Sequence, residues 1–163
     1  MNTVYLALGT NVGNRIANLN LVHHLISQNI GIVSKESSIY QTAAWGVEGQ
    51  EDYYNQVFCV KTSLSPVDLL HKCQVIEKKM GRIQAIKWAP RIIDIDILFF
   101  NDMVLAKDNL KIPHSLLQER NFVLKPLSEI AGEWEHPILK KTITELLDEC
   151  TDDLSVVPLK LAN

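Results

Sequence analysis

Four segments of the chain combine apolar residues with the period of two that is typical of β-strands. They are expected at residues 3–8, 30–40, 53–62 and 92–100. In the third segment, Tyr54, Phe58 and Val60 share one face, because successive side chains of a strand point to opposite sides. The pattern therefore predicts four strands.

Two other segments have apolar residues at helical spacing. The first follows a cap at Asn11 or Asn14, and its apolar positions are Ile16, Leu19, Val22, Leu25 and Ile26. The second starts at Ser65 as N-cap, with Pro66 in the first helical position and Asp68 three residues after the cap. It ends at Gly81, and its apolar stripe is Leu69, Cys73, Ile76 and Met80.

The order strand, helix, strand, strand, helix, strand is that of a ferredoxin-like fold. We therefore expect an α+β structure, an α/β sandwich in which the βαββαβ unit forms an antiparallel sheet with both helices on one face. Two extra C-terminal helices, at residues 119–131 and 143–150, are then free to cover the other face. No repeat or linker divides residues 1–163, so we expect a single domain. Residues 151–163 fit a strand, a tail or a contact surface.

Composition narrows the class of protein. Hydrophobic residues make up 47% and charged residues 21% of the chain, as in ordinary globular proteins, and no apolar run is long enough to span a bilayer. The N-terminus lacks the basic start and apolar stretch of a secretory signal. Three widely spaced cysteines argue against a disulfide framework or zinc site, and a net charge of −3 gives no reason to expect nucleic-acid binding. We expect a cytoplasmic monomer without membrane or nucleic-acid partners.

The fourth predicted strand carries the most specific chemical feature, the pair Asp94 and Asp96. The residues expected to face the core are Ile93, Ile95, Ile97 and Phe99. Both carboxylates then lie on the other face, about 7 Å apart at the backbone, and can bind Mg²⁺ together with phosphate oxygens. The alternative is a solvated acidic face, which the rarity of aspartate in strands and the repulsion between the two charges make less favourable.

The loop before this strand is basic. Residues 78–91 contain no acid, and their cations are Lys78, Lys79, Arg82, Lys87 and Arg91. Lys78 and Lys79 suit the C-terminal end of the second helix, whereas Arg82 and Arg91 suit phosphate, because guanidinium binds oxygens in pairs. A basic loop beside paired acids is what a magnesium-bound polyphosphate requires.

Other candidates are dispersed along the chain. Tyr53 and Asn55 share a face of the third strand, where a ring and a carboxamide suit a flat heterocycle, although a surface tyrosine and a strand-edge asparagine explain them equally well. His114 and Arg120 add a histidine and a cation, and a lone histidine is more often structural. Neither a P-loop motif nor G-x-G-x-x-G is present, which excludes a P-loop kinase and the usual dinucleotide-binding domain.

At Lys87-Trp88-Ala89-Pro90-Arg91-Ile92-Ile93-Asp94-Ile95-Asp96-Ile97-Leu98 the chain resembles the 6-hydroxymethyl-7,8-dihydropterin pyrophosphokinases. The resemblance covers most of the chain and includes residues 8–13, 53–55, 77–82, 113–114 and 120–127. It implies an ATP-dependent pyrophosphokinase, a diphosphotransferase of folate biosynthesis that makes the pterin diphosphate and AMP.

The resemblance also implies roles for individual residues. Asp94 and Asp96 would bind two Mg²⁺ ions, and Arg82 and Arg91 would complete the catalytic set. The residues implied in ATP binding are Gln74, Glu77, Arg82, Arg91, Ile97, Lys111, His114 and Arg120. Those implied in pterin binding are Thr42, Tyr53, Asn55, Trp88, Asp94 and Phe122. Loops at residues 9–13, 41–52 and 81–91 would close over both substrates, as long loops in compact domains commonly do.

The chain departs from the family pattern at Ala44, Trp45, Gln84 and Ser115. Gln84 stands where a second loop arginine is frequent, so we expect Gln84→Arg to raise kcat. Two alternative functions stay open: a degenerate homologue that binds ATP without transfer, and a non-catalytic ferredoxin-like module that binds a ligand or RNA. RNA-binding sheets carry exposed aromatic residues on their central strands, where this chain is expected to carry Asp94 and Asp96 instead.

Overall fold

The computed structural model of the chain describes residues 1–43, 51–81 and 92–160. Its main sheet has the strand order β5-β1-β4-β3-β8, with β2 also paired to β4, and all of these pairings are antiparallel. The strands are β1 (Asn2–Thr10), β2 (Gly31–Glu36), β3 (Tyr40–Thr42), β4 (Tyr53–Thr62), β5 (Asp94–Phe100) and β8 (Val156–Pro158). Because β5 is an edge strand that pairs only with β1 in this sheet order, the expectation that Asp94 and Asp96 lie on a central strand was wrong.

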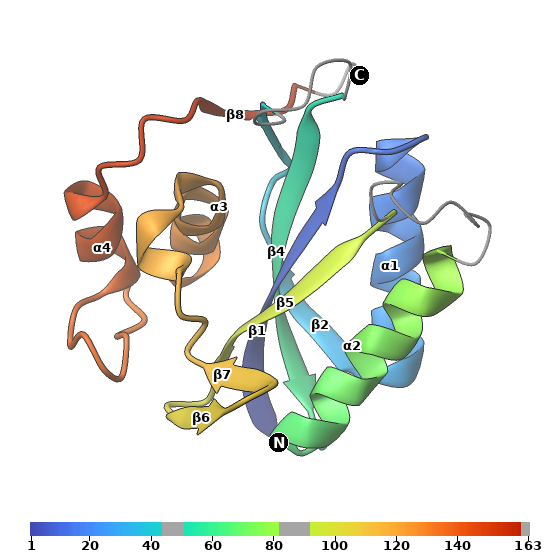
Figure 1. The fold of residues 1–163 in the computed structure, drawn as a ribbon, viewed down its shortest axis with the longest axis horizontal. Coiled ribbons are helices and arrows are strands. Elements are labelled where there is room, and N and C mark those ends of the chain that lie inside the picture. The colour runs from blue at the N-terminus through green and yellow to red at the C-terminus, as the bar shows by residue number, and fades with distance from the viewer. Residues whose placement is uncertain (44–50, 82–91, 161–163) are drawn as a thin grey trace.

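Helices cover both faces of this sheet (Figure 1). One face carries α1 (Arg15–Asn29) and α2 (Pro66–Gly81), and the other carries α3 (Asn121–Ala131) and α4 (Ile143–Glu149). The hairpin of β6 (Leu105–Lys107) and β7 (Leu110–Ile112) and the 3-10 helix η1 (Leu117–Glu119) connect β5 to α3. The ferredoxin-like α+β arrangement and both extra helices are confirmed, with α3 starting two residues late because the 3-10 turn precedes it.

The two expected helix starts are also confirmed. The Asn14 side chain caps α1 by accepting a hydrogen bond from Ala17 N (3.0 Å), and Ser65 Oγ accepts one from Asp68 N (3.2 Å) at the start of α2. The predicted stripe of α2 is buried against the sheet: Leu69, Cys73, Ile76 and Met80. Within the part of the chain that the structure describes, no helix is both long and apolar enough to cross a membrane.

The strand expected at residues 30–40 is interrupted. Ser37 takes the place of a regular ladder position, because its Oγ accepts a hydrogen bond from Val57 N (2.9 Å) and its carbonyl accepts one from Gln56 Nε2 (2.7 Å). The chain therefore forms two strands, β2 and β3, which both pair with β4. Such side-chain bonding to a neighbouring strand leaves no mark in the hydrophobic pattern.

One register prediction on β5 was wrong. Ile93, Ile95 and Ile97 face the core beside α1 and α2 as expected, but Phe99 lies in the core on the α3 and α4 side. The cause is an irregularity in the pairing with β1, where Leu6 pairs with Ile97 and Tyr5 with Phe99. The extra residue, Leu98, reverses the alternation for the rest of the strand, as a β-bulge does.

The C-terminal residues proved to be part of the sheet. After α4 the chain returns to the sheet, where β8 pairs with β3. Of the three interpretations of residues 151–163, a strand is therefore correct for β8. The three cysteines, Cys59, Cys73 and Cys150, are free thiols, as expected. A single domain over residues 1–163 stays a prediction.

Candidate active site

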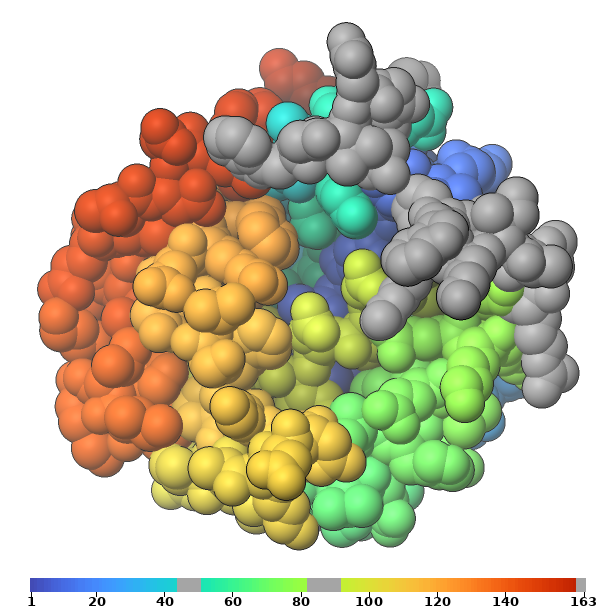
Figure 2. All heavy atoms as spheres, in the orientation of Figure 1, coloured from blue at the N-terminus to red at the C-terminus, as the bar shows by residue number. Residues whose placement is uncertain are grey.

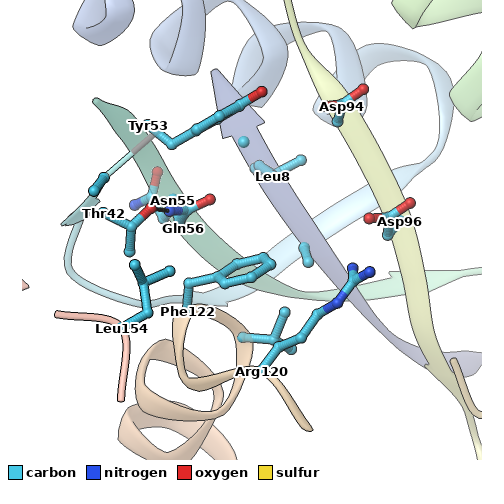
Figure 3. A pocket seen from close by; sticks show the side chains of 14 residues that line it. Leu8, Thr42, Tyr53, Asn55, Gln56, Asp94, Asp96, Arg120, Phe122 and Leu154 are labelled. Carbon is cyan, nitrogen blue, oxygen red and sulfur yellow. Dashed lines mark hydrogen bonds between the residues drawn. The ribbon is translucent and has the colours of Figure 1, made fainter. Parts of the chain in front are cut away.

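A hollow opens on the α3 side of the sheet, and β5 lies at its floor between α3 and α2 (Figure 2). It contains a cavity of about 340 Å³ that is lined by residues of β1, β3, β4, β5 and the start of α3. Figure 3 shows its side chains, which come from segments far apart in the sequence. Most of the side chains that were singled out in the sequence and described in the structure lie here or in the cavity next to it.

The carboxylates of Asp94 and Asp96 both line this cavity, which confirms that they share a face of β5. Pairing with β1 places Asp94 opposite Gly9 and Asp96 opposite Ala7, so small residues leave space in front of both acids. Glu77 of α2 holds the strand between them, because its Oε2 accepts a hydrogen bond from Ile95 N (3.1 Å). The strand is therefore fixed from behind, and the acids project into the open side.

The carboxylate oxygens of Asp94 and Asp96 suit a hard cation such as Mg²⁺. Among residues 1–43, 51–81 and 92–160, no group of three or more His, Cys, Asp or Glu side chains is placed to hold a metal ion. Asp94 and Asp96 would therefore need oxygens from water and from a substrate to complete a coordination shell. Mg²⁺ in nucleotide-dependent enzymes is commonly bound in this way, by one or two carboxylates and phosphate oxygens.

The opposite part of the cavity suits a flat polar ring. The rings of Tyr53 and Phe122 lie on two sides of the space, with Thr42 and Asn55 between them (Figure 3). Asn55 Nδ2 donates a hydrogen bond to Thr42 Oγ1 (2.7 Å), which fixes the carboxamide. A Cβ on Gly9 would lie 3.1 Å from Asn55 Oδ1, so glycine keeps this position uncrowded. Burial, and then the charge of Asp94, raise the pKa of Tyr53, so its hydroxyl stays neutral.

Arg120 supplies a positive charge on the α3 side. It precedes the first residue of α3, and its guanidinium extends toward the side of the cavity where Asp96 lies (Figure 3). The guanidinium carbon lies 5.6 Å from the centroid of the Phe122 ring. One short segment thus contributes both a cation and an aromatic wall to the same cavity.

A second cavity of about 350 Å³ adjoins the first at Asp96, which lines both. Its lining includes Ile97, Lys111 and His114. His114 Nδ1 accepts a hydrogen bond from Leu116 N (3.2 Å), and burial lowers the pKa of the imidazole. In the neutral ring that results, Nε2 carries the proton and can donate to an anion.

The structure thus distributes the candidates over two neighbouring cavities. The first holds Thr42, Tyr53, Asn55, Asp94, Asp96, Arg120 and Phe122, and the second holds Asp96, Ile97, Lys111 and His114. Glu77 lies behind β5, and Gln74 is exposed on α2 and lines neither cavity. The predictions for Arg82, Trp88, Arg91, Ala44, Trp45 and Gln84 fall outside the described residues.

Sequence reasoning missed several lining residues. Leu154 lines the first cavity, although nothing in the sequence links residues after α4 to the site. Asp108 and Asn109 line the second cavity from the turn between β6 and β7. Their composition indicates a turn, but only the fold brings that turn to β5.

Comparisons with known proteins identify the family of the chain. The family model for 7,8-dihydro-6-hydroxymethylpterin-pyrophosphokinase (HPPK) matches residues 5–132. The chain is 43% identical over 151 residues to a 2-amino-4-hydroxy-6-hydroxymethyldihydropteridine pyrophosphokinase of Aquifex aeolicus. This alignment covers 93% of this chain and 94% of that protein. With the Bacillus subtilis protein of the same name, identity is 42% over 135 residues, with 82% of this chain and 81% of that protein covered.

A similar fold occurs in a solved structure of Plasmodium falciparum HPPK-DHPS, wild type, with a TM-score of 0.76 and 20% identity. The match covers 91% of this chain but only 44% of the Plasmodium chain, so this chain spans less than half of that length. At this identity the likeness concerns the fold, whereas the family model and the two bacterial relatives concern the sequence itself. The chain therefore belongs to the 7,8-dihydro-6-hydroxymethylpterin-pyrophosphokinase family.

Proposed function

We propose that this chain transfers a pyrophosphoryl group from ATP to the hydroxymethyl group of 6-hydroxymethyl-7,8-dihydropterin, giving AMP and the pterin diphosphate for folate biosynthesis. Membership of a family of ATP-dependent pyrophosphokinases supports this reaction. The observation that carries it is the meeting of two cavities at Asp96. One cavity has the aromatic walls that suit a pterin, and the other has the cationic and imidazole groups that suit a nucleotide.

For the pterin, we assign the first cavity. Tyr53 and Phe122 would stack on the two faces of the ring, and Asn55 would bind its polar edge, because its carboxamide is already held by Thr42. Trp88 and Asp94 complete the proposed pterin set. The hydroxymethyl group would then point toward β5, where the acids lie.

For ATP, we assign the second cavity and the boundary with the first. His114 and Arg120 would bind phosphate oxygens, and Lys111 and Ile97 would border the nucleoside. The remaining residues of the proposed ATP set are Gln74, Glu77, Arg82 and Arg91. The neutral His114 ring would donate through Nε2, while Arg120 would offer paired N–H groups to the phosphates.

Asp94 and Asp96 fit the role of magnesium ligands, because both carboxylates line the cavity and Mg²⁺ commonly completes its coordination with water and phosphate oxygens. We propose that they hold two Mg²⁺ ions. Bound magnesium would neutralise phosphate oxygens and favour displacement at phosphorus. The cavity residues would act by positioning: the walls hold the pterin, its hydroxyl attacks the β-phosphorus in line, and Arg82, Arg91 and Arg120 stabilise the negative charge while AMP leaves.

The proposal is tested by incubating the protein with ATP, Mg²⁺ and 6-hydroxymethyl-7,8-dihydropterin. AMP and the pterin diphosphate are expected in equal amounts, and only when all three components are present. ATP binding without AMP formation would favour the degenerate homologue. If neither ATP nor the pterin binds, the result would favour the non-catalytic ferredoxin-like module that binds another ligand or RNA. Light scattering of the same sample tests the proposed monomer.

A further inference from the structure

The residues that follow α4 connect two walls of the first cavity. Residues 152–158, which we call the C-terminal strap, pass the start of α3 and end in β8, beside β3 (Figure 1). The family model ends at residue 132, so the strap lies outside the matched part of the chain.

Asp152 anchors the strap to the first residue of α3. Its Oδ2 accepts a hydrogen bond from Asn121 N (3.0 Å), and its backbone carbonyl accepts one from the Asn121 side chain. Arg120, the N-cap residue, makes no side-chain capping hydrogen bond. The Asp152 carboxylate therefore satisfies a helix N–H that the local sequence leaves open, and its negative charge suits the N-terminal end of the helix.

The anchored position lies between two lining residues of the cavity. Arg120 and Phe122 flank Asn121, and both line the cavity. The other oxygen of Asp152, Oδ1, accepts a hydrogen bond from Leu154 N (3.0 Å), and the Leu154 side chain lies beside Thr42 on the side of Phe122 (Figure 3). One carboxylate thus holds backbone groups next to three lining side chains.

The far end of the strap is attached to the opposite wall. Lys125 Nζ of α3 donates a hydrogen bond to Val156 O (3.2 Å), and Val156 pairs with Thr42 in the ladder between β8 and β3. Thr42 in turn holds Asn55. The strap therefore links the wall that carries Phe122 to the wall that carries Asn55, in addition to the core contacts between α3 and β4.

From this geometry we infer that Asp152 is a positioning residue for the reaction, acting through Arg120, Phe122 and Leu154. The inference rests on the proposed function, which assigns Phe122 to the pterin and Arg120 to ATP. Loss of the carboxylate would free the first turn of α3 and the strap together. Both substrates would then be bound less well, whereas loss of the Leu154 side chain would affect the pterin alone.

The test compares Asp152→Ala, Asp152→Asn and Leu154→Ala with Asp153→Ala, which removes the same charge from the exposed neighbouring position. KM for each substrate is measured well below the unfolding temperature. Pterin affinity is also measured by fluorescence with a non-hydrolysable ATP analogue, a readout independent of turnover. Asp152→Ala is expected to raise both KM values about three- to tenfold, because the free energy with which the cap stabilises the first turn of α3 is then lost from the substrate-bound conformation. Leu154→Ala should raise only the pterin KM, and Asp153→Ala should change neither beyond twofold.

Asp152→Asn retains one carbonyl acceptor and is expected to give intermediate values. Asp152→Ala with both KM values within twofold of the wild type would overturn the inference, even if its unfolding temperature fell. If Asp152→Ala does not fold, wild-type kinetics and pterin affinity for Asp152→Asn would overturn it equally. Failure of the proposed function is distinguishable, because the wild-type protein would then form no AMP.

Discussion

The sheet face that carries α3 and α4 has two halves of opposite chemistry, although the same strands run through both. In the covered half, Tyr5 contacts Phe99 and Trp134 edge to face, with ring centroids 6.2 and 5.1 Å apart. In the open half, β1 and β5 present Gly9 and Asp94 to the cavity. The covered half is an apolar core, and the open half is the candidate active site.

The change occurs along single strands, where side-chain size decides it. On β1 the side chains facing α3 and α4 decrease from Tyr5 to Ala7 to Gly9, so the sheet surface recedes toward the cavity. Polar groups are tolerated there because they are paired, as with Asn55 and Thr42, or partly exposed, as with Asp94. The comparison predicts that substitutions in the open half alter activity and those in the covered half alter stability.

The largest effect is expected for Asp96→Ala, because Asp96 lines both cavities. kcat should fall by about a thousandfold, and Asp94→Ala should behave similarly. For Asp96→Ala, the midpoint of thermal unfolding should stay the same or rise, since two neighbouring carboxylates repel. Asp102→Ala, an exposed acid just beyond β5, is the control for loss of charge. Near-normal turnover in both cavity variants would remove the magnesium assignment.

A substitution in the covered half should do the reverse. Leu127 is fully buried between α3 and the sheet, so Leu127→Ala should lower the free energy of unfolding by about 2–5 kcal/mol in urea titrations. KM for both substrates should stay within twofold. Leu21→Ala, the same change at an exposed position of α1, should cost less than about 0.5 kcal/mol. A large rise in KM for Leu127→Ala would show that the two halves are not independent.

Tyr53→Ala tests whether an aromatic ring in the open half binds the pterin. Loss of the ring should weaken pterin binding by about 1–3 kcal/mol if it stacks as aromatic residues do on nucleic-acid bases. Tyr53→Phe keeps the ring and should bind the pterin within twofold of the wild type. Calorimetric titration of each substrate checks this, with ATP affinity expected to be unchanged. Equal weakening by both variants would assign the effect to the hydroxyl instead.

The smallest effect concerns pH and the covered half. His136 is buried, its Nδ1 accepts hydrogen bonds from Ile138 N (3.2 Å) and Leu139 N (3.0 Å), and burial lowers its pKa. Below about pH 6.5 the unfolded chain then binds the proton more readily than the folded chain. The free energy of unfolding should therefore decrease as the pH is lowered below about 6.5, by at most about 1.4 kcal/mol per pH unit for one site.

His136→Asn removes this titration and should make the decrease shallower, although the similarly lowered pKa of His114 still contributes. Urea denaturation at several pH values between 5 and 8 measures the slope, over the range where histidine ordinarily titrates. An unchanged slope in His136→Asn would contradict the prediction.

Local features of the fold could be predicted because they depend on residues close together in the chain. The caps at Asn14 and Ser65 and the common face of Asp94 and Asp96 all follow from spacings of two or three residues. The interruption at Ser37 and the bulge at Leu98 could not be predicted, because each depends on hydrogen bonding or register with a distant strand.

The sequence by itself determined the order of the βαββαβ elements and the common face of Asp94 and Asp96, because alternation and helical spacing act over short distances. Most other candidate members of the site came from the resemblance to the family. Only the tertiary structure decided which of these members meet. Arg120 and Phe122 reach β5 because α3 packs across the sheet, and Leu154 joins them because Asp152 binds the start of that helix. Such contacts join segments far apart in the chain, and no local pattern encodes where a distant backbone N–H will find its acceptor.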